Sequence, residues 1–288
     1  MTKISFLYKI ESGGGDVRGI SLYIYQAGKG VVPENWIQTE SINLDRRLIR
    51  LQRLYYINSG RGEMILPDGE RRPFDAGKIY VFPYNLPQRF ETDPLDRIDH
   101  IYFDFISTPP IIADRPIEYN VDSAAPTAHM VELLDSLLVA RRVDGAPIDS
   151  SPAMSIRAAS DTPCGSEDEY RQIIYQLLYS LLMLLSHDRE LPFMSDEVII
   201  SSLEYMRAHE NERVSVSELA SRAGFELNYF IRRFKRAMGT TPYAYMRACR
   251  LMRAEELLSR GGSVTSTAEL VGYENASSLS RAMRGTRD

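Results

Sequence analysis

Cysteine and histidine are scarce in this 288-residue chain, and this scarcity limits the chemistry that the chain can support. The two cysteines, Cys164 and Cys249, lie far apart in the sequence, a pattern that excludes a disulfide framework and fits a reducing compartment. Only one of the four histidines, His100, falls in the region where strands are expected. Because metal-dependent β-barrel enzymes commonly bind their metal with two or three histidines and a carboxylate, we expect neither a metal nor another cofactor.

Motifs of catalysis are missing as well. The sequence has no Gly-x-Ser-x-Gly, no phosphate-binding glycine-rich loop and no Cys/His metal spacing. The SGGGD at 12–16 is followed neither by Lys-Ser/Thr nor by a helical pattern, so we interpret it as a loop. We therefore expect that the protein is not an enzyme.

Long apolar runs are also absent. The most apolar stretch, IIYQLLYSLLMLL at 173–185, is too short to span a bilayer and contains Gln176. The first residues, MTKISFLYKIESGGG, have no apolar core long enough for a signal peptide. We expect a soluble, cytoplasmic protein with no membrane partner.

Acidic side chains are missing from one stretch of an otherwise acidic chain. The net charge is −5, yet residues 227–254 contain seven basic residues and no acidic one. Residues 196–288 hold 14 Lys and Arg against 12 Asp and Glu, a balance of +2, which leaves −7 for the first 195 residues. An acidic protein with one local basic stripe is expected to bind an anion through that stripe.

Two kinds of periodicity divide the chain. From about 46 to 107, short β-like runs alternate with Gly- and Pro-containing turns, which is typical of a sandwich or barrel. Helical periodicity begins near 127, a loop-like stretch follows, and further helices are expected at about 167–187 and after 195. We expect an α+β protein with a β-barrel amino-terminal domain followed by helices, and an all-α carboxy-terminal domain. The expected boundaries are 1–125 for the β domain, 126–190 for dimerisation helices and a linker, and 191–288 for the helical domain.

The stretch VSVSELASRAGFEL at 214–227 predicts a short helix and a sharp turn. Ser215 or Ser217 is a suitable N-cap, and Gly224 suits a turn that needs positive φ. The next residues, NYFIRRFKRAMGTTP at 228–242, predict a helix with apolar side chains on one face and basic side chains over the remainder. A short helix, a glycine-containing turn and a basic second helix form a helix-turn-helix, whose second helix enters the major groove of DNA.

The same pattern occurs a second time. SVSELASRAGFE at 215–226 aligns with SVTSTAELVGYE at 263–274, and the glycines Gly224 and Gly272 match. The following NASSLSRAMR has Asn275 as a suitable N-cap. We expect two helix-turn-helix units in tandem, joined by a long helix at about 242–259, and placed so that they occupy successive major grooves on one face of DNA.

These motifs resemble those of the AraC family of transcriptional regulators. The resemblance covers about 195–284 and lies in ELASRAGF, YFIRRFKRAMGTTPYAYMRACRLMRAEELL and TAELVGYENASSLSRAMR. The β-rich part, in LYYINSGRGEMIL and FDAGKIYVFPYNLPQRF, is similar to the cupin-type effector domain of the family. The resemblance implies a ligand-responsive, sequence-specific regulator that binds double-stranded DNA.

The resemblance also assigns roles to the residues of the two second helices. Base contacts in the first unit would come from Asn228, Ile231 and Arg232, and phosphate contacts from Tyr229, Lys235 and Arg236. In the second unit base contacts would come from Ala276, Ser277, Ser280 and Arg281. Phosphate contacts position a protein on DNA, whereas base contacts carry sequence information.

The chain departs from the family pattern at three places. Glu226 stands where a Ser-like cap is usual, and Asp104 replaces a common His in its strand. The chain ends at Asp288, before the Gly, Pro and aromatic residues with which the family usually continues, so we expect a shortened second unit.

One charged residue, Arg53, lies on an otherwise apolar strand face in IRLQRLYYI at 49–57. An arginine buried there without a partner would be costly. Two interpretations stay open: Arg53 reaches water at the rim of the sheet, or it lines a polar and aromatic pocket suited to a sugar. The pocket would comprise Trp36, Arg53, Tyr55, Tyr80, Tyr84, Gln88, Tyr102 and Asp104.

The helix at 167–187 has an apolar face two residues wide. Ile174, Leu178, Leu181 and Leu185 form one stripe, and Ile173, Leu177 and Leu184 widen it. Such a face is expected to pack on the barrel and to leave a seam for a second subunit. We favour a homodimeric, carbohydrate-responsive regulator. Two alternatives are a cupin enzyme, which the shortage of histidine disfavours, and a metal-free sugar-binding module whose helical part serves protein contacts.

Overall fold

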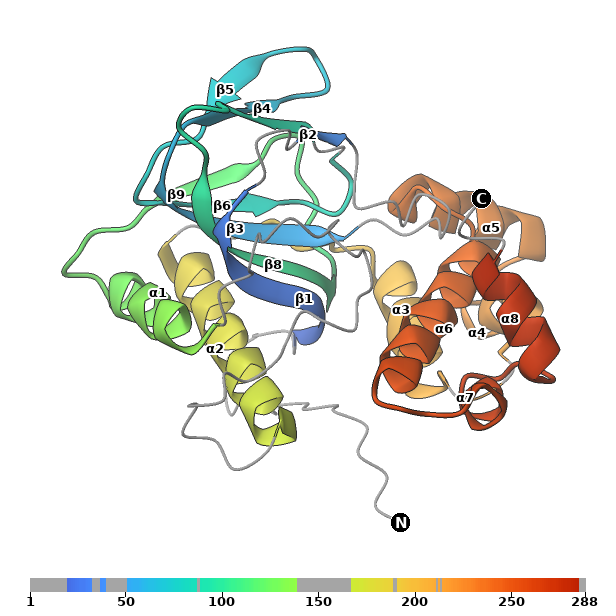
Figure 1. Ribbon diagram of the computed structural model, residues 1–288. Helices are drawn as coiled ribbons and strands as arrows, with labels where there is room; N and C mark the ends of the chain where they lie inside the picture. The colour runs from blue at the N-terminus through green and yellow to red at the C-terminus, as the bar shows by residue number, and fades with distance from the viewer. Residues whose placement is uncertain are drawn as a thin grey trace.

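The computed structural model describes residues 20–32, 37–39, 51–86, 89–138, 167–188, 191–210, 212 and 214–284. Strands occupy the amino-terminal part and helices the carboxy-terminal part, with a pair of helices between them in sequence (Figure 1). The expected α+β class is confirmed, and so is the all-α carboxy-terminal part with two helix-turn-helix units. The boundaries near 125 and 190 stay predictions.

Nine strands form two separate sheets in the described residues. The five-stranded sheet has the order β1-β8-β3-β6-β9 and the four-stranded sheet the order β2-β7-β4-β5. In the described residues they do not close into the barrel that the sequence predicted, and the two sheets together form a cupin-like β part. Every pair of neighbouring strands is antiparallel. The strands are β1 Ser21–Val31, β2 Ile37–Thr39, β3 Gln52–Ser59, β4 Gly62–Ile65, β5 Arg71–Pro73, β6 Lys78–Phe82, β7 Arg89–Thr92, β8 Asp99–Thr108 and β9 Ile117–Asn120.

The turn between β3 and β4 requires glycine. Gly60 has a φ of 87°, which is in the left-handed region, and an added Cβ would lie 2.2 Å from the carbonyl oxygen of Arg97. No other residue fits such a close approach of backbone to backbone. The turn carries the chain from the five-stranded sheet into the four-stranded one, so the sheets face each other across a core of aromatic side chains.

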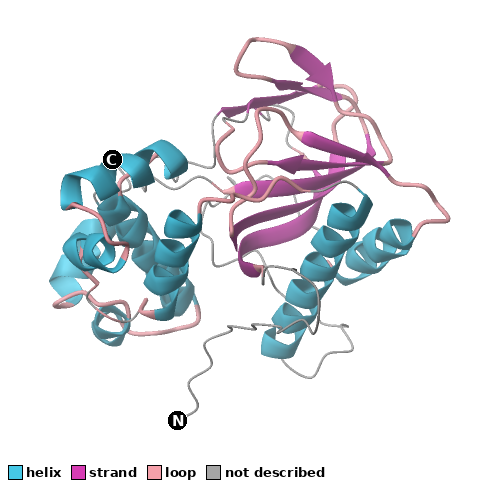
Figure 2. Ribbon diagram, turned by 180° about the vertical axis from the view of Figure 1, so that it is seen from behind, coloured by secondary structure: helices cyan, strands magenta, loops and turns pink. Residues whose placement is uncertain are grey.

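Two helices, α1 Pro126–Leu137 and α2 Glu167–Asp188, cover the other face of the five-stranded sheet (Figures 1 and 2). The stripe expected on α2 is used inside the molecule, since Ile174, Leu178, Leu181 and Leu185 pack with sheet residues such as Phe103. These four side chains are therefore part of the core and cannot form a seam with another subunit. The wider edge of the face, with Ile173 as its most exposed residue, remains outside.

The carboxy-terminal part consists of short helices around two apolar clusters. The larger cluster joins the helices to the near ends of the strands, through Tyr25, Leu51, Tyr84 and Ile106. The smaller cluster holds the last two helices against α6. Among the described residues, none of the helices combines the length and the hydropathy that a bilayer-spanning segment needs. The helices are α3 Glu197–Ala208, α4 Val216–Arg222, α5 Leu227–Met238, α6 Pro242–Ser259, α7 Val264–Leu270 and α8 Ala276–Arg284.

Candidate nucleic-acid interface and ligand sites

The first helix-turn-helix unit is built by caps at both of its helices. Ser215 caps α4 by accepting a hydrogen bond from the backbone N–H of Glu218 at 3.1 Å, and Gly224 takes a φ of 72° in the turn. Glu226, the departure from the family pattern, caps α5 by accepting from the N–H of Tyr229 at 3.0 Å. Hydrogen bonds from the backbone N–H groups of Asn228 and Tyr229 lower the pKa of the Glu226 carboxyl group. A carboxylate therefore replaces the usual hydroxyl cap here.

The second helix of this unit, α5, has one buried and one exposed face. Phe230, Phe234 and Met238 are buried, as the spacing predicted. The polar side chains assigned to DNA lie on the rest of the helix. Asn228, Tyr229, Arg232, Lys235 and Arg236 are exposed, and Ile231 is half-buried.

The second unit repeats the geometry. Ser263 caps α7 by accepting from the N–H of Ser266, and Asn275 accepts from the N–H of Ser278 at 2.8 Å at the start of α8, as expected. Leu279 is the buried residue of α8. Among the residues assigned to DNA, Ser277 and Arg281 are exposed, and Ala276 and Ser280 are half-buried.

Several basic residues of the stripe at 227–254 have partners within the protein and are not available to bind DNA. Arg233 binds both carboxylate oxygens of Asp196, the N-cap of α3, at 3.1 and 3.0 Å. Arg253 pairs with Glu256 at 2.7 Å. Arg247 and Arg250 donate to backbone carbonyl groups. Four of the seven cations are therefore engaged within the protein, and Arg232, Lys235 and Arg236 are the exposed ones.

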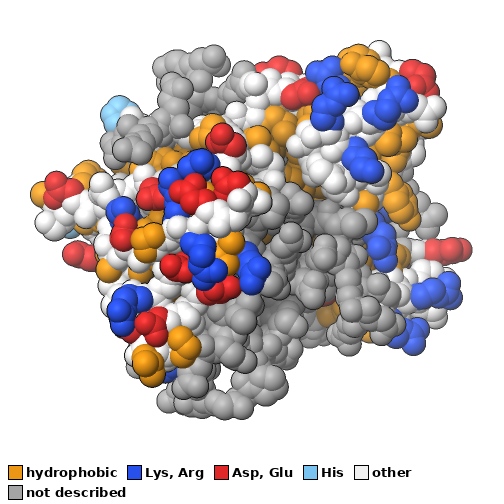
Figure 3. Space-filling model, turned by 90° about the horizontal axis from the view of Figure 1, so that it is seen from above, with side chains coloured by type: hydrophobic (Ala, Val, Ile, Leu, Met, Phe, Trp, Pro, Cys, Tyr) orange, Lys and Arg blue, Asp and Glu red, His pale blue; other side chains and the backbone are white. Residues whose placement is uncertain are grey.

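Acidic and basic side chains pair off on the outside of the β part, where the two colours adjoin in Figure 3. Arg71 bridges Glu63 and Glu91 at 2.8 and 2.5 Å, and Arg72 binds Glu70 at 2.8 Å. Because these charges neutralise one another, this surface does not present a field of one sign to DNA. Arg71 and Arg72 are thus engaged in ion pairs, whereas Arg232, Lys235 and Arg236 of the helical part are exposed.

The burial of Arg53 excludes one of its two interpretations, the one in which the side chain reaches water at the rim of the sheet. Its side chain is 1 % exposed, so it does not reach the rim of the sheet. Asp104 lies opposite it on β8, and the Nε of Arg53 is 2.9 Å from the carboxylate of Asp104. Gln26, the partner of Asp104 on β1, also donates to this carboxylate. Burial alone would lower the pKa of the guanidinium, but Asp104 and Tyr55 raise it, so the charge is retained.

The aromatic residues expected around Arg53 are partly gathered there. Tyr55 and Tyr102 are opposite each other in the register, Tyr80 is the partner of Tyr55 on β6, and all three pack between the two sheets. Burial raises the pKa of Tyr55 above its usual range. Tyr84 belongs instead to the core shared with the helices. Trp36 and Gln88 lie outside the described residues.

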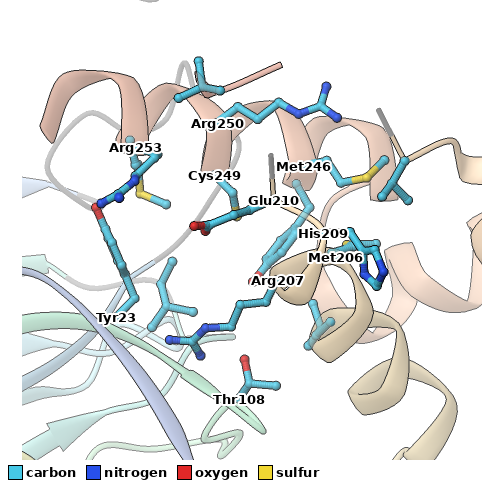
Figure 4. Close-up of a pocket in the computed structure, with 16 residues that line it drawn as sticks. Tyr23, Thr108, Met206, Arg207, His209, Glu210, Met246, Cys249, Arg250 and Arg253 are labelled. Atoms are coloured by element: carbon cyan, nitrogen blue, oxygen red, sulfur yellow. The ribbon is translucent and has the colours of Figure 1, made fainter. Parts of the chain in front are cut away.

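A cavity that the sequence did not indicate lies between the strands and the helices (Figure 4). Its volume is about 90 Å³. Tyr23 comes from β1, Ile106 from β8, Met206 from α3, and Met246 and Cys249 from α6. No local motif could have revealed it, because its walls come from four elements that are distant in the chain.

Three arginines line this cavity: Arg207, Arg250 and Arg253. Arg207 donates to the hydroxyl of Ser21 and, at 2.6 Å, to the carbonyl oxygen of Leu22, so it ties α3 to β1. In Figure 4 its guanidinium points down to the strands, and Arg250 lies along the opposite side. The hydroxyl of Tyr23 is 3.5 Å from the carboxylate of Glu256. Burial raises the pKa of Cys249 to about 12, so this thiol is protonated at neutral pH.

The described residues contain no group of three His, Cys, Asp or Glu side chains arranged as a metal ion would need. The one histidine of the strands, His100, places Nδ1 3.1 Å from the carbonyl oxygen of Gly30 and stacks beside Tyr102. Its role in this geometry is structural, within the aromatic core.

Residues 219–286 match the family model described as a helix-turn-helix domain. The probable transcriptional regulator LumQ of Photobacterium leiognathi is 36% identical over 81 residues, which are 28% of this chain and 33% of that protein. The uncharacterized HTH-type transcriptional regulator YobQ of Bacillus subtilis is 30% identical over 82 residues, 28% of this chain and 34% of YobQ. The chain therefore spans about a third of the length of the curated relatives that it matches.

Solved structures with a similar arrangement include ToxT from Vibrio cholerae, at 10% identity and a TM-score of 0.48, covering 93% of this chain and 95% of ToxT. The AraC-like transcriptional activator CuxR matches at 12% identity and a TM-score of 0.33, over 82% of this chain and 78% of CuxR. LumQ and YobQ are both described as transcriptional regulators, LumQ as a probable one. The helix-turn-helix match confirms the resemblance seen in the sequence.

Proposed function

We propose that this chain, whose carboxy-terminal domain is an AraC-type helix-turn-helix domain, is a sequence-specific transcription regulator that responds to a small molecule. The observation that carries the proposal is the pair of capped second helices, α5 and α8, which expose Arg232 and Arg281 while their apolar faces are buried. Exposed arginines on a helix that fits the major groove read base edges, most often guanine. Because such a regulator has to contact DNA, we propose that the protein is cytoplasmic.

The residues of α5 and α8 divide into two roles. Asn228, Ile231 and Arg232 near the start of α5 contact bases, while Tyr229, Lys235 and Arg236 contact phosphates. In α8, Ala276, Ser277, Ser280 and Arg281 contact bases. The amino-terminal residues of a recognition helix contact base edges, which supports the roles of Asn228, Ile231 and Arg232 and fits phosphate contacts for Lys235 and Arg236 further along α5.

The test is selection of bound DNA from a pool of randomised duplexes, followed by titration of the selected and a scrambled duplex at 50 and 200 mM salt. Specific binding predicts a selected sequence with two conserved boxes and an affinity at least about 10³-fold above the scrambled duplex. Selection of no sequence, with equal affinity for both duplexes, would leave the helical part to protein contacts, which is the alternative of a sugar-binding module.

The small-molecule site that we propose is the interior of the β part, and its ligand is a carbohydrate. A buried Arg53–Asp104 pair between tyrosine rings supports this, because sugars are held by charged and amide groups at their hydroxyls and by aromatic faces at their C–H surfaces. Tyr55, Tyr80 and Tyr102 with Trp36 and Gln88 complete the proposed site, whereas Tyr84 is left out of it because Tyr84 packs in the core shared with the helices.

A second candidate site is the cavity between strands and helices. Its support is specific: the cavity already has volume, and its walls belong to both the β part and the DNA-reading part, so a ligand there would bear on both. Its apolar lining and the arginines at its edge favour a small, mainly apolar molecule with an acidic group.

Two variants distinguish the sites. Tyr102→Phe removes a hydroxyl from the interior of the β part, whereas Cys249→Leu fills the cavity with extra carbon atoms. We expect a stabilising sugar from a panel to raise the melting temperature of the wild-type chain and of Cys249→Leu, and to lose much of its effect in Tyr102→Phe. The reverse pattern, obtained with an apolar acid, would assign the ligand to the cavity.

We also propose a homodimer. Leu133 on α1 and Ile173 on α2 are 44% and 37% exposed, on neighbouring helices that pack on the same sheet. Exposed apolar side chains on adjacent helices favour association with a second copy. Light scattering of the full chain at about ten micromolar is expected to show a dimer, and Leu133→Glu with Ile173→Glu is expected to give a folded monomer. A monomeric wild-type chain would reject the proposal.

A further inference from the structure

The second helix-turn-helix unit is attached to the rest of the protein by a small apolar cluster. Leu251 and Ala254 of α6 meet Ala268, Val271 and Leu279 there. The first unit, in contrast, shares its core with α3, α6 and the strands. A small contact buries little area and, by itself, fixes the orientation of two helices weakly. Other interactions must therefore hold α7 and α8 at a defined angle to α6.

One such interaction comes from Arg250, which touches both units. Its Nη2 donates to the carbonyl oxygen of Glu212, just before the first unit, at 2.9 Å. The same guanidinium lies over the turn of the second unit: a Cβ added to Gly272 would be 3.8 Å from Nε and 3.9 Å from Cζ of Arg250. Gly272 has a φ of 75°, so this turn is built around a residue without a side chain.

Arg247, one turn earlier on α6, makes the complementary contacts. Its Nη2 donates to the carbonyl oxygen of Ala282, near the end of α8, at 3.4 Å. Burial raises the pKa of Tyr273, which follows Gly272 in the turn, and the nearby charge of Arg247 partly opposes this rise. A cation at the carboxyl end of a helix is stabilised by the helix dipole. The two arginines thus hold the turn before α8 and the end of α8.

We infer that Arg247 and Arg250 are positioning residues, which fix the second unit relative to the first and so set the spacing between the two DNA boxes that the protein reads. The inference rests on the proposed binding of DNA. The guanidinium is suited to this task because its planar set of donors has fixed directions, whereas the ammonium of lysine is a flexible point charge. Replacement by lysine therefore keeps the charge and loses the geometry.

The preferred spacing between the two DNA boxes is a sensitive measure of how rigidly the two units are joined, because DNA is a helix. Adding one base pair between two boxes moves the second box by about 3.4 Å and turns it by about a tenth of a helical turn. A rigid pair of recognition helices tolerates this poorly, while a loosely attached second unit follows the displaced box. A general loss of folding or of phosphate contacts would instead weaken binding at every spacing alike.

The experiment starts from duplexes selected on the wild-type chain and varies the gap between the two boxes by −1, 0, +1 and +2 base pairs. The wild-type chain is expected to prefer its own spacing over the others by about tenfold or more, on the scale of one mismatched base pair. In Arg247→Lys and Arg250→Lys we expect this preference to fall to less than about threefold, with unchanged affinity for DNA carrying only the first box.

The matched control is Arg253→Lys, on the same helix, because Arg253 pairs with Glu256 and not with the second unit. It is expected to keep the spacing preference. Unchanged preference in Arg247→Lys and Arg250→Lys would overturn the inference, as would an equal loss of affinity at all spacings.

Hydrogen exchange provides a readout that does not depend on DNA. In the two lysine variants the amides of α7 and α8 are expected to exchange faster than in the wild-type chain, while those of α4 and α5 keep their rates. Equal rates in wild type and variants would refute the anchoring. A wild-type chain that binds no DNA, with faster exchange in the variants, would reject the proposed function and leave the anchoring intact.

Discussion

The two helix-turn-helix units have the same local design and different surroundings. Both begin with a serine cap, Ser215 or Ser263, and both turn at a glycine with positive φ. The first unit, however, buries Phe230 and Phe234 in a core that extends to the strands, while the second buries mainly Leu279 in a small cluster with α6. Local sequence thus determines the shape of each unit, and burial determines how firmly each is held.

The largest expected effect of this difference in anchoring concerns stability, and it is tested by removing a core side chain from each unit. Phe234→Ala is expected to lower the free energy of unfolding of the whole chain by about 3–5 kcal/mol, because it leaves a cavity in a core shared with α6. Leu279→Ala is expected to act locally, with fast hydrogen exchange confined to α7 and α8. Equal global losses in the melting curves of both variants would show that the units are held alike.

DNA binding provides the next test. Arg232→Ala is expected to weaken binding to the selected duplex by about 1–3 kcal/mol and to relax the preference at one base position. Lys235→Ala, the matched variant on the same helix, is expected to weaken all sequences alike and to reduce the salt slope by about one unit. Fluorescence anisotropy on selected and scrambled duplexes measures both. An equal loss on both duplexes for Arg232→Ala would remove its base contact.

The caps allow a comparison at matched positions. Ser215→Ala and Ser263→Ala each remove one hydroxyl that accepts from a backbone N–H at 3.1 Å, so each is expected to cost about 0.5–2 kcal/mol of local stability. In the first unit the cost should appear in the main melting transition, and in the second only in hydrogen exchange of α7. A cap effect of the same kind in both would contradict the difference in anchoring.

The smallest expected effect depends on pH and concerns the first unit alone. Burial would raise the pKa of Asp196, but the hydrogen bond from Arg233 and those from backbone N–H groups lower it overall. A carboxyl group whose pKa is lower in the folded than in the unfolded state stabilises the fold at pH values above its unfolded-state pKa. This stabilisation is lost as the pH falls through the folded-state pKa. We therefore expect the melting temperature to fall below about pH 4, and Arg233→Gln to reduce this acid dependence. An unchanged acid profile in the variant would exclude the ion pair as its cause.

The helical part was largely predictable because its signals are local. Caps, glycine turns and apolar spacing act within about one helical turn, so the long helix at 242–259 and the cap at Asn275 were predicted at the right residues. Glu226 looked like a departure from the family pattern and yet caps α5, because a carboxylate accepts the same N–H groups as a hydroxyl.

The parts that sequence could not predict depend on partners that are distant in the chain. The apolar stripe of α2 has the right spacing for either a sheet or a second subunit, and only the fold shows that Leu178 and Leu181 face the sheet. Arg53 had two possible environments, and the register that sets it beside Asp104 is a property of three strands together. The cavity between strands and helices has the same origin.

The core shared by strands and helices also bears on how this protein can be recombined with others. Tyr25, Leu51, Tyr84 and Ile106 of the β part belong to the same apolar cluster as Phe230 and Phe234 of the first unit. A chimaera that keeps this helical part and takes its β part from another regulator would disturb this cluster unless the four β residues are transferred too. A chimaera with a single junction in the sequence would therefore separate side chains that pack together. The exchanged set of residues has to follow this shared core instead.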